Sequence, residues 1–451
     1  MSKPMDLLLK GGTVVTSRGH ERVDVGIKNE VVSGLAMDLP SASAEQVIDV
    51  SGRLLLPGVI DVHVHPVYTD DIEGCSRVAA YGGTTTLLHF AYARQGQSLY
   101  EETGKMLADG LAHSRLDFGL HAGMFDAPNH VPEIPHTMEL GVRTFKFFMP
   151  YIKQGWTTDD YQLLKAMDML ATSGGMAMVH AENGGGVDYL EDKYLTGPDA
   201  SAELFNLTRP AALEEEATFR ALRLAEVANC PLYIVHVTTA RSLPHIKAAR
   251  EAGQIVYAET CAHYLTLTQD IIKTHGALAK VGPPIRTEED RLALWLAIRD
   301  NTLQAVSSDH AAKIKEPAND FLEQGFGSPQ LETLFPLTYD EGINKGRISL
   351  IRLTQILSEN PARIFGLYPK KGTIAVGSDA DILVLDPTRE FMITPENQHS
   401  NVGYTLYEGR TILGWPELTL QRGHPVLQRG EIVAQPGEGQ FLQPELKRVL
   451  V

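Results

Sequence analysis

Four histidines, a lysine and an aspartate stand near the ends of short apolar segments of this sequence. They are His63 and His65 in GVIDVHVH, Lys146 in TFKFFM, His180 in MAMVHAE, His236 in LYIVHVT and Asp309 in QAVSSDH. Imidazole nitrogens and carboxylate oxygens are the donors that zinc-class cations accept. The set therefore predicts a metal centre, provided that the fold brings these segment ends together.

Lys146 is the unusual member of the set, because GVRTFKFFMPY (residues 141–151) otherwise reads as a buried strand. Burying an ammonium without a partner is costly, and an ammonium has no lone pair for a metal. A neutral lysine that has reacted with carbon dioxide becomes a carbamate, with two oxygens and a negative charge. We therefore hypothesise that carboxylated Lys146 bridges two metal ions.

The alternation of side chains along a strand decides which way these residues face. His63 and His65 are two residues apart, so they project to the same side of their strand. By the same rule the two phenylalanines that flank Lys146 face covering helices, and Lys146 faces inward. The lysine is therefore expected to point towards the histidines.

Eight segments of the chain have the length and apolar character of strands. They are residues 58–65, 84–90, 117–124, 144–149, 176–182, 232–238, 254–260 and 304–310. Helical patterns such as 213–228 and 288–300 fall between them, which predicts an α/β fold with a (β/α)8 TIM barrel. A doubly wound sheet is the alternative, but no GxGxxG-type loop follows any strand. In such barrels the chemistry lies at the carboxyl ends of the strands.

The two ends of the chain have a different pattern from the middle. Residues 1–56 and 372–435 consist of short β-rich runs separated by glycine-containing turns. This pattern is typical of antiparallel sheet. We expect both ends to form one small composite β-sandwich domain beside a barrel at 57–371. No role can be assigned to the C-terminal tail, 436–451.

Composition excludes several classes of protein. The 451-residue chain carries a net charge of -16, which argues against binding to nucleic acid or to anionic membranes. No apolar run is long enough for a membrane span, and the N-terminal run is too short for a signal peptide. Three cysteines without a CxxC spacing suit a reducing compartment. A cytoplasmic location is expected.

Other polar residues near the strand ends suit structural roles. His89 and His121 are expected to pack or to contact the ligands from behind, and His310 is expected to orient Asp309. Glu182 and Asn183 are expected to anchor their loop. Glu214–Glu216 are expected to form a solvated first turn of a helix. A single histidine at a strand end is more often a hydrogen-bonded structural residue than a ligand. The metal hypothesis therefore depends on the whole pattern.

Taken in order, nine segments resemble the amidohydrolase superfamily, and within it the dihydropyrimidinase/hydantoinase branch of cyclic amidohydrolases. They are PGVIDVHVH, GGTTTLLHF, TFKFFMPY, VHAENGG, NCPLYIVHVT, AETCAHYL, VGPPIR, SSDH and NPARIFGLYPKKGTIAVGSDADILVLDP. They cover nearly the whole chain. The resemblance implies a barrel with a composite sandwich, a binuclear zinc site with a carboxylated lysine, and a homotetramer or homodimer.

The resemblance implies a ligand role for each matching position. His63 and His65 match the ligands of the more buried metal, and His180 and His236 match those of the second. Lys146 matches the carbamate that bridges the two ions.

Two further positions match residues that act in the reaction. Asp309 matches a ligand that also carries the proton from the attacking hydroxide to the departing ring nitrogen. Tyr151, in FMPY, matches the tyrosine that hydrogen-bonds to the developing oxyanion. Both are therefore expected to be catalytic.

The expected substrate contacts are where this chain departs from the branch. Gly282 in VGPPIR stands where a serine is usual, and Phe326 in GFGSPQLE stands near a usual asparagine. His263, in AETCAHYLTLT, brings the chain closer to allantoinases and dihydroorotases, although a structural role in a loop also suits it. Tyr151 favours the hydantoinases. We expect Tyr151, Gly282 and Phe326 to contact the substrate.

Together these features predict hydrolysis of a small cyclic amide, a dihydropyrimidine or a 5-substituted hydantoin, to an N-carbamoyl amino acid. An allantoinase- or dihydroorotase-like specificity is the alternative. Dihydroorotate carries a carboxylate that needs a cation, but Pro66 rather than arginine follows His65. A non-catalytic scaffold related to dihydropyrimidinase would have lost ligands, and all six are present here.

Overall fold

The computed structural model describes residues 5–196, 201–316 and 321–451. Eight parallel strands form its central sheet and pair in sequence order. They are β8 (Val59–Val64), β9 (Thr84–Ala93), β10 (Asp117–Met124), β11 (Thr144–Phe148), β12 (Met176–His180), β13 (Leu232–Ile234), β14 (Val256–Cys261) and β15 (Ala305–Ser307). A parallel bridge between Val64 and His310 brings the end of the sheet back to its first strand. The predicted (β/α)8 barrel is confirmed.

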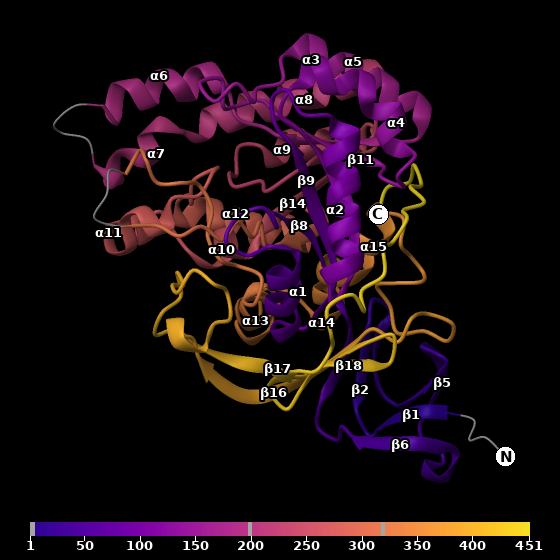
Figure 1. Ribbon diagram of the computed structural model, residues 1–451. Helices are drawn as coiled ribbons and strands as arrows, with labels where there is room; N and C mark the ends of the chain where they lie inside the picture. The colour runs from indigo at the N-terminus through magenta and orange to yellow at the C-terminus, as the bar shows by residue number, and fades with distance from the viewer. Residues whose placement is uncertain (1–4, 197–200, 317–320) are drawn as a thin grey trace.

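Helices follow the strands and cover the outside of the barrel (Figure 1). The longer ones are α1 (Ile72–Tyr81), α2 (Leu99–His113), α5 (Asp160–Ser173), α6 (Gly184–Tyr194), α8 (Ala211–Ala228), α9 (Leu243–Glu251) and α12 (Glu288–Arg299). The short ones are α3 (Ala127–His130), α4 (Ile134–Met138), α7 (Phe205–Thr208), α10 (Ala262–Thr266), α11 (Ile271–His275), α13 (Leu334–Tyr339), α14 (Leu350–Thr354) and α15 (Asn360–Ile364). Side chains cap several N-termini: Ser98 accepts from the N–H of Glu101, and Thr287 forms a capping box with Asp290.

The strand alternation predicted for β11 holds. Phe145 and Phe147 are fully buried and belong to the apolar layer that includes Leu163 and Met167 of α5. Lys146, between them, lines a cavity inside the barrel instead. The apolar neighbours thus fix the strand against its helix and leave the lysine facing inward.

The chain ends form two further sheets. The first has the order β5-β4-β1-β6, and the second has the order β19-β18-β17-β16-β7-β2-β3. Their bounds are β1 (Met5–Lys10), β2 (Thr13–Thr16), β3 (Gly19–Arg22), β4 (Asp24–Lys28), β5 (Val31–Ala36), β6 (Ala44–Asp49), β7 (Leu54–Pro57), β16 (Ile382–Met392), β17 (Thr411–Gln421), β18 (His424–Gln428) and β19 (Glu431–Ile432).

The second sheet mixes both ends of the chain, because β16 pairs antiparallel with β7. Leu9 and Val25 of the first sheet share an apolar cluster with Ile382 and Leu420 of the second. In Figure 1 the indigo and yellow strands lie together below the barrel. The composite sandwich is confirmed, while the boundaries at residues 56, 371 and 435 stay predictions.

The C-terminal tail lies against the starts of the barrel strands. Leu442 N–H donates to the carbonyl of Phe118 at 2.7 Å, and Phe118 N–H donates to Gln440 at 2.9 Å. Farther on, the Tyr257 hydroxyl donates to the Val449 carbonyl. Residues 118 and 257 are each the second residue of a barrel strand. The tail therefore covers the face of the barrel opposite the predicted site.

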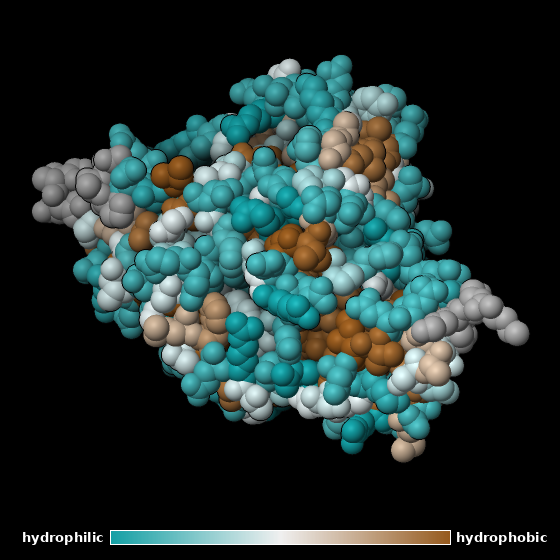
Figure 2. All heavy atoms as spheres, turned by 60° about the horizontal axis from the view of Figure 1, so that its bottom comes forward, coloured by the Kyte–Doolittle hydropathy of each residue, from teal (hydrophilic) through white to brown (hydrophobic). Residues whose placement is uncertain are grey.

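Among the described helices, none is both long and apolar enough to cross a membrane. Seen with the sandwich brought forward, the surface is mostly hydrophilic, and its hydrophobic groups lie in separate patches (Figure 2).

Candidate metal centre and active site

One cavity of about 260 Å³ collects every residue that the sequence predicts for the site. Its lining includes His63, His65, Lys146, Tyr151, His180, His236, Gly282, Asp309 and Phe326. These residues come from the ends of β8, β11, β12, β13 and β15, or from the loops that follow the strands. The segment ends therefore converge, as the metal hypothesis requires.

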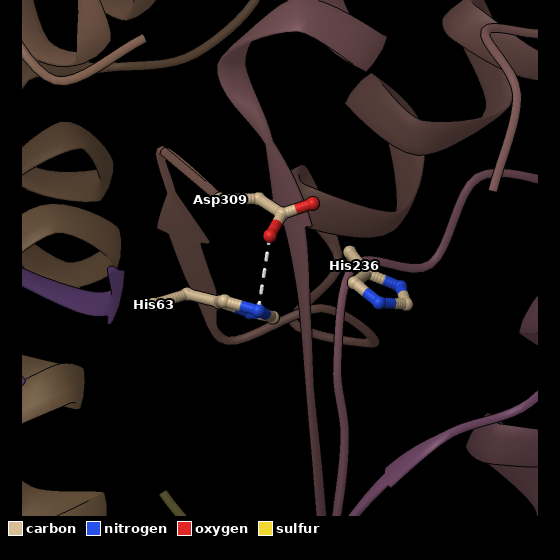
Figure 3. A group of neighbouring side chains, drawn as sticks. All are labelled: His63, His236 and Asp309. Carbon is tan, nitrogen blue, oxygen red and sulfur yellow. Dashed lines mark ion pairs between the residues drawn. The ribbon is translucent and has the colours of Figure 1, made fainter. Parts of the chain in front are cut away.

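His63, His65 and Asp309 form a tight group of donor atoms. The two Nε2 atoms are 3.2 Å apart, and Asp309 Oδ1 lies 3.1 Å from His63 Nε2 and 3.0 Å from His65 Nε2. Donor atoms of His63, His236 and Asp309 also lie within 4.8 Å of one another (Figure 3). Two ligands of one tetrahedral zinc ion are about 3.3 Å apart. The observed spacing fits donors that share an ion.

Glu259 and Tyr92 turn His63, in β8, and His65, just after β8, towards the cavity. His63 Nδ1 lies 2.5 Å from Glu259 Oε1, and the Tyr233 hydroxyl donates to Glu259 Oε2 at 2.9 Å. The Tyr92 hydroxyl lies 2.7 Å from His65 Nδ1. Each contact leaves Nε2 facing the cavity, as second partners of metal-bound histidines do. Neither Glu259 nor Tyr92 was predicted from the sequence, although a carboxylate within the buried run VYAETC is the same kind of signal as Lys146.

His180 is held by a buried ion pair. Its Nε2 atom lies 2.7 Å from Glu182 Oε2, which also accepts from Arg209 Nη1 at 2.6 Å. Because Nε2 is engaged by Glu182, Nδ1 is the His180 nitrogen that remains able to bind a metal ion in the cavity. Glu182 therefore ties its loop to Arg209, as expected of a loop anchor, and in addition orients His180. Asn183 also anchors the loop, because its side chain caps α6 by accepting from the Gly186 N–H.

Three residues of the site have left-handed backbone conformations. The φ angles are +70° at Tyr151, +38° at His236 and +49° at Asp309. Such conformations cost about 1–3 kcal/mol for residues other than glycine and concentrate at functional sites. The fold therefore tolerates local strain to direct these three side chains.

The environment of Lys146 makes the neutral amine easier to reach than it is in an exposed lysine. The residue is 1% exposed, and its Nζ atom lies 4.8 Å from the ring centroid of Phe90 and 5.1 Å from that of Phe148. Burial lowers the pKa of Lys146 to about 8, although the charges of Asp309 and Glu259 oppose the shift. The neutral amine is the form that reacts with carbon dioxide.

Burial keeps three of the histidines in the form that binds metal, whereas the charges of Asp309 and Glu259 outweigh burial and raise the pKa of His63. Burial lowers the pKa of His65 to about 3 and the pKa values of His180 and His236 well below their usual range. Neutral imidazole is the ligand form, so no proton has to leave these three rings before an ion binds.

The three expected substrate contacts lie together. A Cβ atom at Gly282 would be 3.1 Å from the Tyr151 hydroxyl oxygen and 3.1 Å from Phe326 Cδ1. Glycine therefore leaves room for both side chains. Behind them, the Arg209 guanidinium lies 4.7 Å from the Phe326 ring centroid and 5.6 Å from that of Tyr151.

Two structural expectations are wrong. His310 does not orient Asp309, because its ring contacts Asp70 at 3.1 Å and accepts from the Gln330 N–H at 3.1 Å. Glu214 is not solvated: it is buried, and Arg286 Nη2 donates to it at 2.9 Å. The burial of Glu214 could not be read from the sequence, because Arg286, which pairs with it, is 72 residues away.

Residues 54–412 match the model of the amidohydrolase family. The chain belongs to this family. The D-hydantoinase of Ralstonia pickettii is 39% identical to it, over 97% of this chain and 99% of its own. A solved D-hydantoinase structure is similar, with a TM-score of 0.93, 38% identity and coverage of 98% of this chain and 99% of that one. The dihydropyrimidinase from Brevibacillus agri NCHU1002 has a TM-score of 0.92, 35% identity and the same coverage. The resemblance to the hydantoinase branch is confirmed.

The donor set of this amidohydrolase fits divalent cations. Four buried imidazoles and the Asp309 carboxylate face one cavity, with the Lys146 amine among them. Nitrogen and oxygen donors of this kind suit zinc or similar ions. The residues present therefore fit the metal chemistry that the sequence predicts.

Changing Glu259 to glutamine should weaken this centre without removing a ligand. Glutamine keeps the size of the side chain but removes the charge that holds His63 Nδ1. Apparent metal affinity, measured by competition with a chelator, should fall by about 10- to 100-fold. Glu289→Gln, on the exposed face of α12, is the matched control. Equal affinities in the two variants would contradict a positioning role for Glu259.

Proposed function

We propose that the protein is a metal-dependent hydrolase that opens a dihydropyrimidine or a 5-substituted hydantoin to an N-carbamoyl amino acid. One observation carries the proposal: four histidines, Lys146 and Asp309 meet in a single buried cavity. The names of the relatives, D-hydantoinase and dihydropyrimidinase, support the same reaction class.

The proposed cofactor is a pair of Zn²⁺ or similar ions. His63 and His65 would hold one ion, His180 and His236 the other, and carboxylated Lys146 would bridge them. When bound, such ions polarise an amide carbonyl and lower the pKa of water. The carbamate is supported by the buried amine, whose pKa is about 8.

The side chains of the cavity then have separate tasks. Asp309, whose Oδ1 lies next to both His63 and His65, accepts the proton of the attacking water and delivers it to the departing ring nitrogen. Tyr151 donates a hydrogen bond to the carbonyl oxygen as negative charge develops. Burial raises the pKa of Tyr151, so the phenol keeps the proton that it must donate. Gly282 and Phe326 shape the wall beside it.

Changing Tyr151 to phenylalanine tests the oxyanion contact. The ring and its packing remain, but one hydrogen-bond donor is lost. We expect kcat to fall by about 10²- to 10³-fold with little change in KM, because the contact strengthens only in the transition state. Steady-state kinetics would measure this, with Tyr161→Phe on the exposed face of α5 as control. An unchanged kcat would remove Tyr151 from the mechanism.

A substrate panel tests the function itself. Metal-loaded protein would be given dihydrouracil, neutral hydantoins, allantoin and dihydroorotate, and the N-carbamoyl product would be followed by mass spectrometry. Opening of dihydrouracil or a hydantoin supports the proposal. Opening of allantoin or dihydroorotate alone would favour an allantoinase- or dihydroorotase-like specificity. If none of the compounds is opened, a non-catalytic scaffold related to dihydropyrimidinase is favoured. The homotetramer or homodimer and the cytoplasmic location stay predictions.

A further inference from the structure

Lys313 is a charged residue of the cavity that the proposed reaction does not use. Its Nζ atom lies 4.0 Å from the Tyr68 ring centroid, and a Cβ atom at Gly325 would lie 3.2 Å from it. Apart from histidines, the charged residues of the described lining are Lys146, Asp309 and Lys313. Lys146 and Asp309 belong to the proposed metal centre. Of these three residues, Lys313 is therefore the one that can contact the substrate.

No described residue neutralises this ammonium. Within the described ranges, no carboxylate lies within ion-pair distance of Lys313 Nζ. The side chain is half-buried, and burial lowers its pKa to about 8, with Arg94 acting in the same direction and Asp309 opposing it. Lys313 therefore keeps its charge at neutral pH in a place where water screens it poorly. Such a cation favours an incoming anion.

The rest of the lining suits a flat ring with a polar arm. Phe125 and Trp156 supply aromatic wall, with their ring centroids 5.2 Å apart. Gln154 and Gln324 add two amide groups to the same lining as Lys313. Amide N–H groups and an ammonium are donors, and a carboxylate accepts from both.

We propose that Lys313 binds a carboxylate on the exocyclic arm of the substrate. The preferred substrates would then be 5-substituted hydantoins whose side chain carries a carboxylate. This inference rests on the proposed function, cyclic amide hydrolysis. No arginine directly follows His65 in this sequence to bind such a carboxylate. In this proposal Lys313, in the loop after Asp309, provides the cation instead.

Two hydantoins of nearly equal shape provide the test. The hydantoin derived from glutamic acid ends in a carboxylate, and the one derived from glutamine ends in the corresponding neutral amide. Metal-loaded wild-type protein should open the acid with the higher kcat/KM. Lys313→Met should lower the acid-to-amide ratio of kcat/KM by about 10- to 100-fold, mainly through KM. Lys313→Arg should preserve the preference, and Lys313→Glu should reverse it.

Lys153→Met is the matched control, because Lys153 precedes Gln154 of the lining but pairs with Asp192, and neither Lys153 nor Asp192 lines the cavity. It should leave the ratio unchanged. A ratio that Lys313→Met does not change, or an equal loss for both compounds, would overturn the inference while cyclic amide hydrolysis stands. If the metal-loaded protein opens neither compound, nor dihydrouracil or a neutral hydantoin, the proposed function itself fails.

Discussion

The Lys146→Ala protein is expected to lose nearly all of its activity. Alanine cannot form a carbamate, so the bridge between the two ions disappears and metal content should fall from about two ions per chain to one or none. A metal centre supplies several kcal/mol of charge stabilisation in the transition state, so kcat/KM should fall by about 10³-fold or more. Metal analysis and steady-state kinetics on the same preparation would measure both losses.

Two controls separate the bridge from damage to the fold. Lys165→Ala, on the exposed face of α5, removes a lysine that has no place in the cavity and should change nothing. Small carboxylates such as acetate should restore part of the activity of Lys146→Ala, because they can fill the space of the missing carbamate. Full metal content in Lys146→Ala would contradict the bridging role.

The pH at which the centre assembles follows from the same lysine. In the metal-free protein the pKa of Lys146 is about 8, so the amine is mostly protonated below this pH and neutral above it. At constant dissolved carbon dioxide, metal uptake should therefore become faster as pH rises towards 8 and level off above it. Uptake with no pH dependence in this range, followed by zinc titration, would contradict a carbamate.

Asp309→Asn should have the second large effect. Asparagine keeps an oxygen donor next to His63 and His65, so most of the metal should remain. The amide cannot accept and return the proton, and kcat should fall by about 10²- to 10⁴-fold. Asp270→Asn, at an exposed position before α11, is the control. A kcat within tenfold of wild type in a metal-loaded Asp309→Asn protein would exclude this residue as the proton carrier.

The fold could be predicted because its signals are local. Each barrel strand is a short apolar run between helical patterns, and β11 carries its orientation in the two phenylalanines around Lys146. The ligands could be predicted for the same reason, since each one stands at a strand end. The composite sandwich followed from the contrast between the β-rich ends and the alternating middle.

Contacts between distant segments could not be read in this way. Glu259 meets His63 across 196 positions of sequence, and Arg286 meets Glu214 across 72. A linear pattern shows that such a residue is unusual but does not reveal its partner. Lys313 is a further case, because its place in the lining depends on the path of a loop.

The most direct test of the central claim is the dependence of ring opening on metal. Protein stripped by a chelator would be titrated with Zn²⁺ while hydantoin and dihydrouracil opening is followed by the appearance of the N-carbamoyl product. We predict no activity in the stripped protein and a rise that saturates near two ions per chain. Ring opening that is unaffected by the chelator, or no ring opening at any zinc concentration, would contradict the account.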